Sequence, residues 1–231
     1  MPLTNPFWIA FGDIHGNLKN FSQIKELADA KGVIITGDIT NAGRTNDADK
    51  LLKKIKSVNP NIYAQIGNMD YPEIITYLEQ EGCNIHAKVV KLNSQTGLMG
   101  LGYSNPTPFS GPSEVDDTTL AKWLDTTYKN LIDVEHLILA THTPPFGCQS
   151  DRLNNGQHVG STAVKNFVQQ YQPDVCITGH IHEAIAEEWL GKTKVINPGM
   201  LSAGGYVTIE QNQNGLEANL SFVESCSSIQ E

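Results

Sequence analysis

Short apolar runs that end in a glycine and a polar residue recur along the first third of the chain. Residues 7–11, 33–36 and 62–66 are mostly apolar, and they lead into Gly12-Asp13, Gly37-Asp38 and Gly67-Asn68. Apolar runs of this length bounded by glycine are typical of buried β-strands. The pattern therefore predicts three strands, each followed by a side chain that can bind a metal ion.

Amphipathic stretches separate these runs and predict helices over residues 18–30, 47–58 and 71–80. A strand, a helix and the next parallel strand together take roughly 30 residues, which matches the spacing of the three runs. Parallel strands end at the same edge of a sheet. We therefore expect Asp13, Asp38 and Asn68 to line one sheet edge.

The rest of the chain predicts further strands and helices around the same edge. Apolar runs at residues 136–141 and 174–178 predict two more strands, which lead into His142 and His180. We also expect a hairpin over 89–92 and 98–101 and an ordered proline-rich loop over 104–113. The remaining expected elements are helices over 116–131 and 163–171 and antiparallel strands over 184–223. Repeats and linkers are absent from this pattern. We expect one α/β (α+β) domain over residues 1–231.

Composition and charge narrow the function. The 231 residues carry a net charge of −9 with only 16 Lys and Arg, so the chain lacks the basic field that attracts long nucleic acids. Bound metal ions would have to supply positive charge for a phosphate substrate. The first residues show neither a basic nor an apolar run of signal length, and nowhere is an apolar run long enough to span a membrane, so we expect a cytoplasmic protein without a membrane partner. Four scattered cysteines, Cys83, Cys148, Cys176 and Cys226, indicate neither a zinc knuckle nor a disulfide framework.

The polar residues that follow the predicted strands have the chemistry of metal ligands. They are Asp13, His15, Asp38, Asn68, His142, His180 and His182. Imidazole, carboxylate and amide groups suit Mn, Fe, Zn, Co or Ni better than Ca or Mg. Seven ligands exceed one tetrahedral centre but suit two ions bridged by a carboxylate, for which Asp38 is the natural choice. Two such ions can hold a hydroxide between them and neutralise phosphoryl oxygens, which predicts hydrolysis of a phosphate ester.

The ordered set of motifs resembles the calcineurin-like metallophosphoesterase superfamily. The matching segments are Asp13-Ile-His15-Gly, Gly37-Asp38, Gly67-Asn68-Met69-Asp70, His142 and Gly179-His180-Ile-His182. A narrower resemblance to the small Icc-related phosphoesterases of bacteria and archaea rests on Ser104-Asn-Pro-Thr-Pro-Phe109, His142-Thr-Pro-Pro145, His158-Val-Gly-Ser161 and Asn197-Pro-Gly199.

The resemblance implies a four-layer αββα sandwich with two metal ions at the sheet edge. Asp13, His15, Asp38 and His182 would hold one ion, and Asp38, Asn68, His142 and His180 the other. It also implies hydrolysis of phosphodiesters or phosphomonoesters, of which we expect a phosphodiester, with Mn as the first ion to test. The substrate would be a small phosphate ester or a nucleotide.

One position departs from the family pattern. The superfamily commonly has histidine directly after the metal-binding asparagine, where it is thought to assist the leaving group, but this chain has Met69. A thioether cannot donate a proton. His158, in a glycine-rich loop before a predicted helix, is a candidate replacement acid or phosphate contact.

Other polar residues have weaker claims. Asn17 is as well suited to cap a helix as to contact phosphate, and Arg44 could contact phosphate or lie in solvent. Asp70 could orient a ligand or cap the following helix. His86 and His136 lie outside the motifs and are expected to be structural or surface residues.

Two alternatives to catalysis stay open at this point. Met69 allows a catalytically weak scaffold that binds metals or another protein on the same fold, and a regulatory module could bind a nucleotide through metals without turnover. Loops over residues 104–113 and 146–160 should set substrate choice, because loops at the ligand edge shape a pocket. The oligomeric state does not follow from the sequence.

Overall fold

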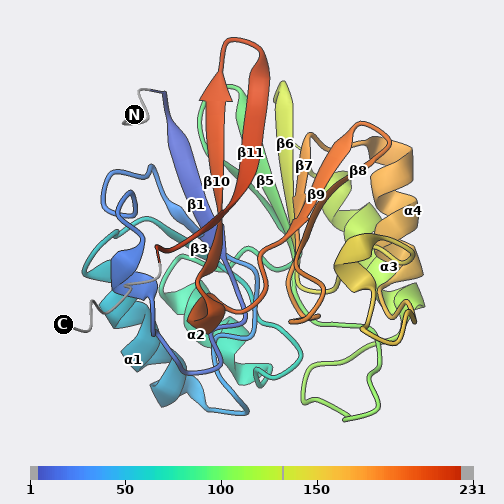
Figure 1. The fold of residues 1–231 in the computed structure, drawn as a ribbon, viewed down its shortest axis with the longest axis horizontal. Coiled ribbons are helices and arrows are strands. Elements are labelled where there is room, and N and C mark those ends of the chain that lie inside the picture. Colours follow the sequence, from blue (N-terminus) through green and yellow to red (C-terminus); the bar gives the residue numbers. More distant parts are fainter. Residues whose placement is uncertain (1–4, 132, 225–231) are drawn as a thin grey trace, which may run out of the picture.

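The computed structural model describes residues 5–131 and 133–224, whose strands form two sheets (Figure 1). The five-stranded sheet has the order β11-β10-β1-β2-β3, and the six-stranded sheet has the order β4-β5-β6-β7-β9-β8. The strands of the first sheet are β1 (Phe7–Phe11), β2 (Val33–Ile35), β3 (Ile62–Ala64), β10 (Gly205–Asn212) and β11 (Gly215–Phe222). Those of the second are β4 (Lys88–Lys91), β5 (Thr96–Leu101), β6 (His136–Thr141), β7 (Val175–Ile177), β8 (Ala186–Leu190) and β9 (Thr193–Asn197).

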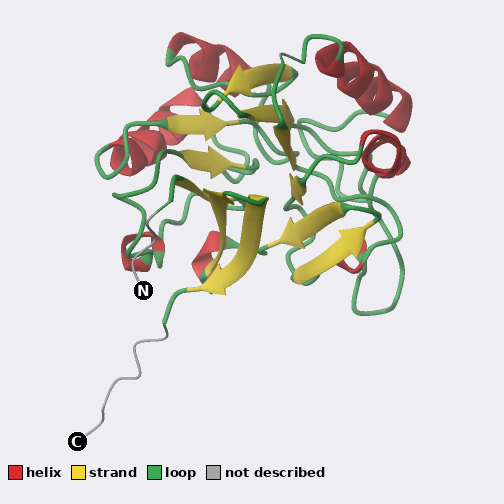
Figure 2. Ribbon diagram, turned by 90° about the horizontal axis from the view of Figure 1, so that it is seen from above, coloured by secondary structure: helices red, strands yellow, loops and turns green. Residues whose placement is uncertain are grey.

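Four α-helices cover the outer faces of the sheets. They are α1 (Thr45–Lys56), α2 (Glu73–Gln80), α3 (Asp117–Tyr128) and α4 (Thr162–Tyr171). In Figure 1, α1 and α2 lie on one side of the strands and α3 and α4 on the other. Seen from above, the strands run through the middle and the helices lie mainly towards the outside (Figure 2).

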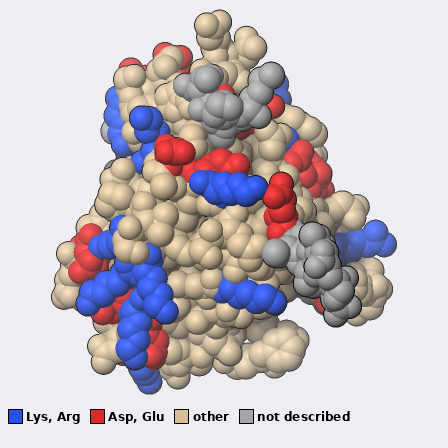
Figure 3. All heavy atoms as spheres, turned by 60° about the vertical axis from the view of Figure 1, so that its left-hand side comes forward, with Lys and Arg blue, Asp and Glu red and all other residues tan. Residues whose placement is uncertain are grey.

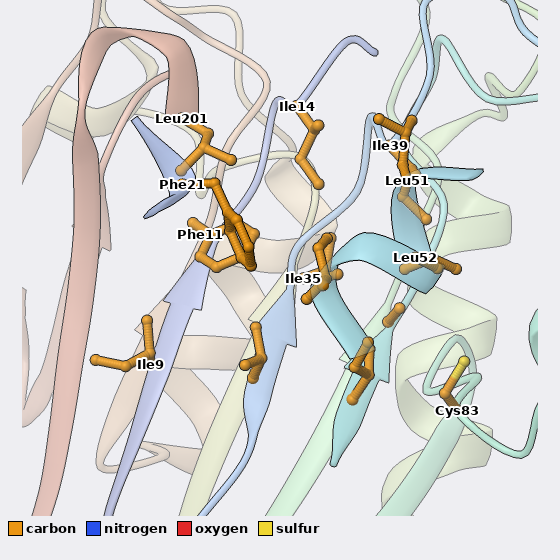
Figure 4. Packing of buried hydrophobic residues seen from close by; sticks show 14 of the residues in the cluster. Ile9, Phe11, Ile14, Phe21, Ile35, Ile39, Leu51, Leu52, Cys83 and Leu201 are labelled. Carbon is orange, nitrogen blue, oxygen red and sulfur yellow. The ribbon is translucent and has the colours of Figure 1, made fainter. Parts of the chain in front are cut away.

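Alternating side chains divide the core into three clusters and explain the layers. Along β1, Ile9 and Phe11 belong to the cluster that also contains the buried residues of α1 and α2, and Phe11 lies beside Phe21 (Figure 4), whereas Trp8 and Ala10 belong to the cluster between the two sheets. In β6, Ile138 and Ala140 on one face belong to the same inter-sheet cluster. Leu137 and Leu139 on the other face belong to the cluster that contains the buried residues of α3 and α4. Successive side chains of a strand point to opposite faces, so each sheet buries both of its faces. The predicted four-layer αββα sandwich is confirmed.

Strand direction brings the predicted ligands to one edge. β1, β2 and β3 are parallel neighbours, and β5, β6, β7 and β9 are parallel in the other sheet. The hairpin predicted over residues 89–92 and 98–101 is also confirmed, because β4 and β5 pair antiparallel.

The helix predicted over residues 18–30 is wrong. The segment forms turns and one short 3-10 helix, η1 (Phe21–Gln23), and its apolar side chains Phe21, Ile24 and Leu27 are buried at every third position. Hydrogen bonds from residue i+3 to residue i join these turns, and Asn59 donates from Nδ2 to the carbonyls of Leu27 and Ala30. A period of three suits successive tight turns rather than an α-helix.

The prediction of antiparallel strands over residues 184–223 is correct in part. β8 pairs antiparallel with β9 and β10 pairs antiparallel with β11, but β9 runs parallel to β7. The segment also divides between the two sheets, which periodicity along one strand cannot reveal. Cys226 lies outside the described residues, and the other three cysteines are buried thiols.

The surface shown in Figure 3 carries Lys and Arg beside Asp and Glu rather than one broad field of a single sign. Within residues 5–131 and 133–224, no helix is both long and apolar enough to cross a membrane.

Candidate metal centre

Five strand ends from the two sheets deliver the predicted ligands to one place. Asp13, Asp38 and Asn68 follow β1, β2 and β3, while His142 follows β6 and His180 follows β7. Ligands beyond the carboxyl ends of parallel strands occupy the usual active-site position of α/β folds. The predicted edge is therefore shared by both sheets.

Four of the residues form a tight cluster. Asp13, His15, Asp38 and His182 each offer a ligand atom, and these atoms all lie within 4.8 Å of one another. His15 Nε2 is 3.5 Å from Asp38 Oδ2, and His182 Nε2 is 3.4 Å from Asp13 Oδ1. This set is the one that the family resemblance implied for one metal ion.

The remaining candidate ligands are Asn68, His142 and His180. His142 Nε2 is 3.4 Å from Asp38 Oδ2 and 3.0 Å from Asn68 Oδ1. The rings of His142 and His180 have centroids 5.1 Å apart. Asp38 Oδ2 is therefore within 3.5 Å of an imidazole nitrogen from each group, that of His15 and that of His142.

The backbone is strained where these ligands lie. Asp13, His15, Asp38 and His180 have φ angles of 48°, 46°, 48° and 70°, in a region that non-glycine residues rarely adopt. Such strain persists only where the surrounding structure imposes it, and it concentrates at functional sites. The turns after the strands thus aim the side chains at one another instead of continuing the strands.

Glycine is required where the ligand turns pack together. A Cβ on Gly67 would lie 2.2 Å from Asp38 Oδ1, and one on Gly179 would lie 2.4 Å from Asp13 Oδ2. The glycines that precede the ligands in the sequence pattern therefore make room for carboxylates from neighbouring strands.

Asp70 holds two of the ligand loops together. Its Oδ2 accepts hydrogen bonds from the amides of Ile39 and Gly67, and its Oδ1 accepts from the amide and hydroxyl of Thr40. Burial, together with the charge of nearby Asp38, raises the pKa of Asp70 to about 6. The sequence left open whether Asp70 caps a helix or orients a ligand; its contacts are with the ligand loops.

Burial and the charges of neighbouring residues shift the pKa values of the candidate ligands. Burial opposes the charged form of Asp38, but His142 and His15 hold its pKa below the usual value. Burial also opposes protonation of His142, yet Asp38 raises its pKa to about 9. Burial and the neighbouring His142 lower the pKa of His180 to about 4. These opposed shifts within one cluster are typical of functional sites.

The donors fit divalent metal ions. Asp13 and Asp38 are buried carboxylates, and within the described part of the chain their ion pairs involve only histidines, without Lys or Arg. Buried carboxylates need a cation or hydrogen-bond donors to offset the loss of water. Oxygen and imidazole donors that converge in this way suit the borderline metals named above.

A cavity of about 1040 Å³ opens beside the cluster. Its walls include Asn105 and Phe109 from the 104–113 loop and Leu153 and His158 from the 146–160 loop, as the sequence predicted. Asn41, Gln157, Glu183 and Met200 also line it, and the sequence had singled out none of these. Glu183 directly follows the predicted ligand His182, so its position could have been noticed. None of the described residues that line the cavity is Lys or Arg.

The other candidate residues lie in different surroundings. His158 and Met69 line the cavity. Asn17 is exposed, and its Oδ1 accepts from the amide of Lys19. Arg44 precedes α1, donates to Glu73 over 3.2 Å and stacks on the ring of Tyr71. Neither Asn17 nor Arg44 is among the residues that line this cavity, and a substrate contact by either residue stays a prediction.

His86 and His136 have structural contacts. The amide of Gly102 donates to His86 Nδ1, whose ring packs against Trp123, and burial lowers the pKa of His86 to about 4. His136 Nδ1 lies 3.1 Å from Asp174 Oδ1, at the start of β6.

Comparison with known proteins identifies a family that matches most of the chain. The sequence profile of calcineurin-like phosphoesterases matches residues 9–184. An uncharacterized protein of Methanocaldococcus jannaschii is 30% identical over 195 residues, which cover 82% of this chain and 86% of that protein.

Solved structures share the fold at low sequence identity. The structure of TT1561 of Thermus thermophilus superimposes with a TM-score of 0.71 at 18% identity, covering 96% of this chain and 100% of that one. A dimetal phosphatase from Danio rerio gives a TM-score of 0.61 at 12% identity, covering 95% and 99%. At these identities the likeness shows the fold alone.

Proposed function

This chain belongs to the calcineurin-like phosphoesterase family and is a metal-dependent phosphoesterase, and we propose that it hydrolyses phosphodiesters at a centre for two divalent metal ions. The observation that carries the proposal is the position of Asp38. Its Oδ2 lies 3.5 Å from His15 Nε2 and 3.4 Å from His142 Nε2, so it is close to one imidazole from each group of ligands. A carboxylate in that position can bridge two ions.

Each group of side chains then has a defined role. Asp13, His15, Asp38 and His182 would hold one ion, and Asp38, Asn68, His142 and His180 would hold the other. Two such ions would supply a nucleophile by acidifying water and would neutralise charge on the phosphoryl group. Asp70 keeps the loops of Asp38 and Asn68 aligned, because its carboxylate accepts from backbone amides of both.

The charge of the cavity favours a diester. Two divalent ions would bring four positive charges, which Asp13, Asp38 and the hydroxide nucleophile would reduce to one, and the single negative charge of a phosphodiester would offset it. A phosphomonoester brings a second negative charge, and none of the described lining residues is a Lys or Arg that could pair with it. Glu183, which also lines the cavity, adds a further negative charge.

The donor set supports Mn as the first metal to test, with Fe, Zn, Co and Ni as alternatives. We extend the proposal to a single metallophosphoesterase domain over residues 1–231, since the family match covers most of it. A small phosphate ester or nucleotide is the expected substrate. The cytoplasmic location expected from the sequence belongs to the same proposal.

Met69 is the observation that favours a different function. It lines the cavity where the superfamily commonly has histidine, and a thioether cannot protonate a leaving group. A catalytically weak metal-binding or protein-interaction scaffold on this fold is therefore the second candidate.

The experiment compares two substrates on protein freed of metal and then supplied with Mn. We expect turnover of bis(p-nitrophenyl) phosphate to exceed that of p-nitrophenyl phosphate. Asp38→Asn should lower the rate at least about 100-fold, since loss of even a residue that only supports the ligands costs 10- to 100-fold. Asp49→Asn, a carboxylate on α1 that binds Lys53 and Tyr77, is the matched control and should leave the rate unchanged. Binding of two ions without turnover of either ester, with any of the five metals, would favour the scaffold.

A further inference from the structure

A histidine and a buried aspartate form a pair at the wall of the cavity. Asp151, in the 3-10 helix η2 (Gln149–Asp151), is fully buried, and its Oδ1 lies 2.6 Å from Nδ1 of His158. Its Oδ2 accepts hydrogen bonds from the amides of Gly147 and Gly160 at 3.0 and 2.9 Å. Both carboxylate oxygens are thus engaged, and the aspartate is held by the same loop that carries the histidine.

The contacts of Asp151 fix the orientation of the imidazole. An ionised carboxylate only accepts hydrogen bonds, so Nδ1 of His158 carries the proton that it shares with Asp151. Nε2 is then the ring nitrogen left for other partners. The side chain of His158 is 32% exposed and lines the same cavity as His15, His180 and His182. A buried carboxylate that orients a cavity-facing imidazole is the arrangement that acid–base catalysis requires.

We propose that His158 is the catalytic residue that protonates the leaving group, and that Asp151 is its positioning residue. The inference rests on the proposed phosphodiester hydrolysis. In this role His158 supplies the proton that Met69 cannot, from a different loop of the same cavity.

The proton moves from His158 to the leaving group in the step that cleaves the ester. The bond from phosphorus to the leaving oxygen breaks as the bond from the attacking water-derived oxygen forms. The leaving oxygen takes the proton from Nε2 of the imidazolium and departs as an alcohol or phenol. His158 is left neutral, with its Nδ1–H still donated to Asp151, and regains the Nε2 proton from solvent.

The chain offers a matched control pair at a distance from this cavity. His136 Nδ1 lies 3.1 Å from Asp174 Oδ1, and Oδ2 of Asp174 accepts from the amide of Leu137. Neither His136 nor Asp174 lines the cavity that contains the metal-ligand candidates. Substitution of the same residue types there tests for general effects on stability.

The experiment measures kcat and KM separately for two diesters that differ only in the leaving group, methyl p-nitrophenyl phosphate and methyl phenyl phosphate. Phenolate is the poorer leaving group and needs the proton more. We expect His158→Gln to lower kcat for the phenyl ester by about 10²–10⁴-fold, and the ratio of the two rates to change at least about tenfold. His136→Gln should change neither rate. Metal content, measured by elemental analysis, should equal that of the wild type in both variants.

Asp151→Asn tests the positioning role. The amide oxygen of asparagine can still accept from Gly147 and Gly160, but its NH₂ group faces Nδ1 of His158 and forces the proton onto Nε2. We expect a loss selective for the phenyl ester, and imidazole ¹⁵N shifts that report a change of tautomer. Asp174→Asn is its control.

The outcomes separate this inference from the proposed function. If the wild type hydrolyses both esters and His158→Gln has the same ratio of the two rates as the wild type, the inference is overturned but the proposed hydrolase function stands. A rise in KM by the same factor for both esters, with kcat unchanged, would overturn it in favour of a phosphate contact. Failure of the wild type to hydrolyse either ester with any of the five metals would instead reject the proposed function.

Discussion

His15 Nε2 and His182 Nε2 lie 2.9 Å apart, although 167 positions separate the two residues in the chain. Their rings meet edge to face with centroids 4.8 Å apart, and each nitrogen is also close to a buried carboxylate. Two imidazole nitrogens that converge beside carboxylates can share a proton or bind one cation. The contact joins the turn after β1 to the turn after β7 and so links the two sheets at the proposed metal centre.

Removal of His182 should therefore empty one metal position and leave the other. We expect His182→Asn to lower the Mn content of the protein from two ions to one, because the second set keeps all of its ligands. His180→Asn should also leave one ion, and the double variant none. Elemental analysis after dialysis measures the content. Equal binding by the double variant and the wild type would contradict the two ligand sets.

Metal uptake should release protons and become tighter as the pH rises. The pKa of His142 in the metal-free centre is about 9, above its ordinary value of 6.5, because Asp38 stabilises the imidazolium. A metal needs the same nitrogen lone pair, so at any pH below about 9 the ion must displace this proton.

Calorimetry in two buffers of different ionisation enthalpy measures this release. The metal-free protein should also lose stability as the pH rises through about 9, because a pKa raised on folding stabilises only the protonated form. Metal affinity that does not change across this range would contradict the prediction.

Asp70 should matter for both stability and metal affinity. Asp70→Ala leaves the buried amides of Ile39, Thr40 and Gly67 without their acceptor, which should lower the free energy of unfolding by at least about 2 kcal/mol. Because these amides belong to the loops of Asp38 and Asn68, we also expect a 10- to 100-fold loss of metal affinity. Chemical unfolding and metal titration measure the two effects. Asp49→Asn on α1 should leave metal affinity unchanged.

A methyl group at Gly67 should disrupt the centre directly. The Cβ of Gly67→Ala would lie 2.2 Å from Asp38 Oδ1 and 2.6 Å from His142 Cε1, so at least one ligand must move. We expect loss of metal binding together with about 1–3 kcal/mol of destabilisation.

Gly82→Ala is the matched control for this substitution. Gly82 has a φ of +68°, but no atom lies within 4 Å of its added Cβ, so the cost should be only about 1–2 kcal/mol of backbone strain. Its metal binding should equal that of the wild type. Weak binding in both variants would show that general destabilisation, rather than the contact with Asp38, explains the loss.

Most candidate ligands of the centre could be predicted from the sequence because they follow a local pattern. An apolar run, a glycine and a ligand-type residue describe Asp38 after β2 and Asn68 after β3, and parallel strands bring such residues to one edge whatever the details of packing. The four helices observed were also predicted, with their ends within a few residues. Periodicity is a property of neighbouring positions, so it can be read without knowledge of the fold.

The tertiary structure decided the features that depend on contacts between distant or irregular segments. Periodicity predicted a helix where residues 18–30 instead follow a series of tight turns, and the carbonyls of Leu27 and Ala30 at their end accept hydrogen bonds from Asn59 of another segment. Arg44 has the charge for a phosphate contact, but Glu73 and Tyr71 hold it outside the cavity lining.

The pairing of His158 with Asp151 was equally hidden from the sequence. The two residues lie in one loop, but only its folded path buries the carboxylate and leaves the imidazole at the cavity. The sequence by itself determined which residue types reach the strand ends, since that depends on local pattern. The tertiary structure decided which of them face one another, because loop paths and side-chain partners are set by packing between segments far apart in the chain.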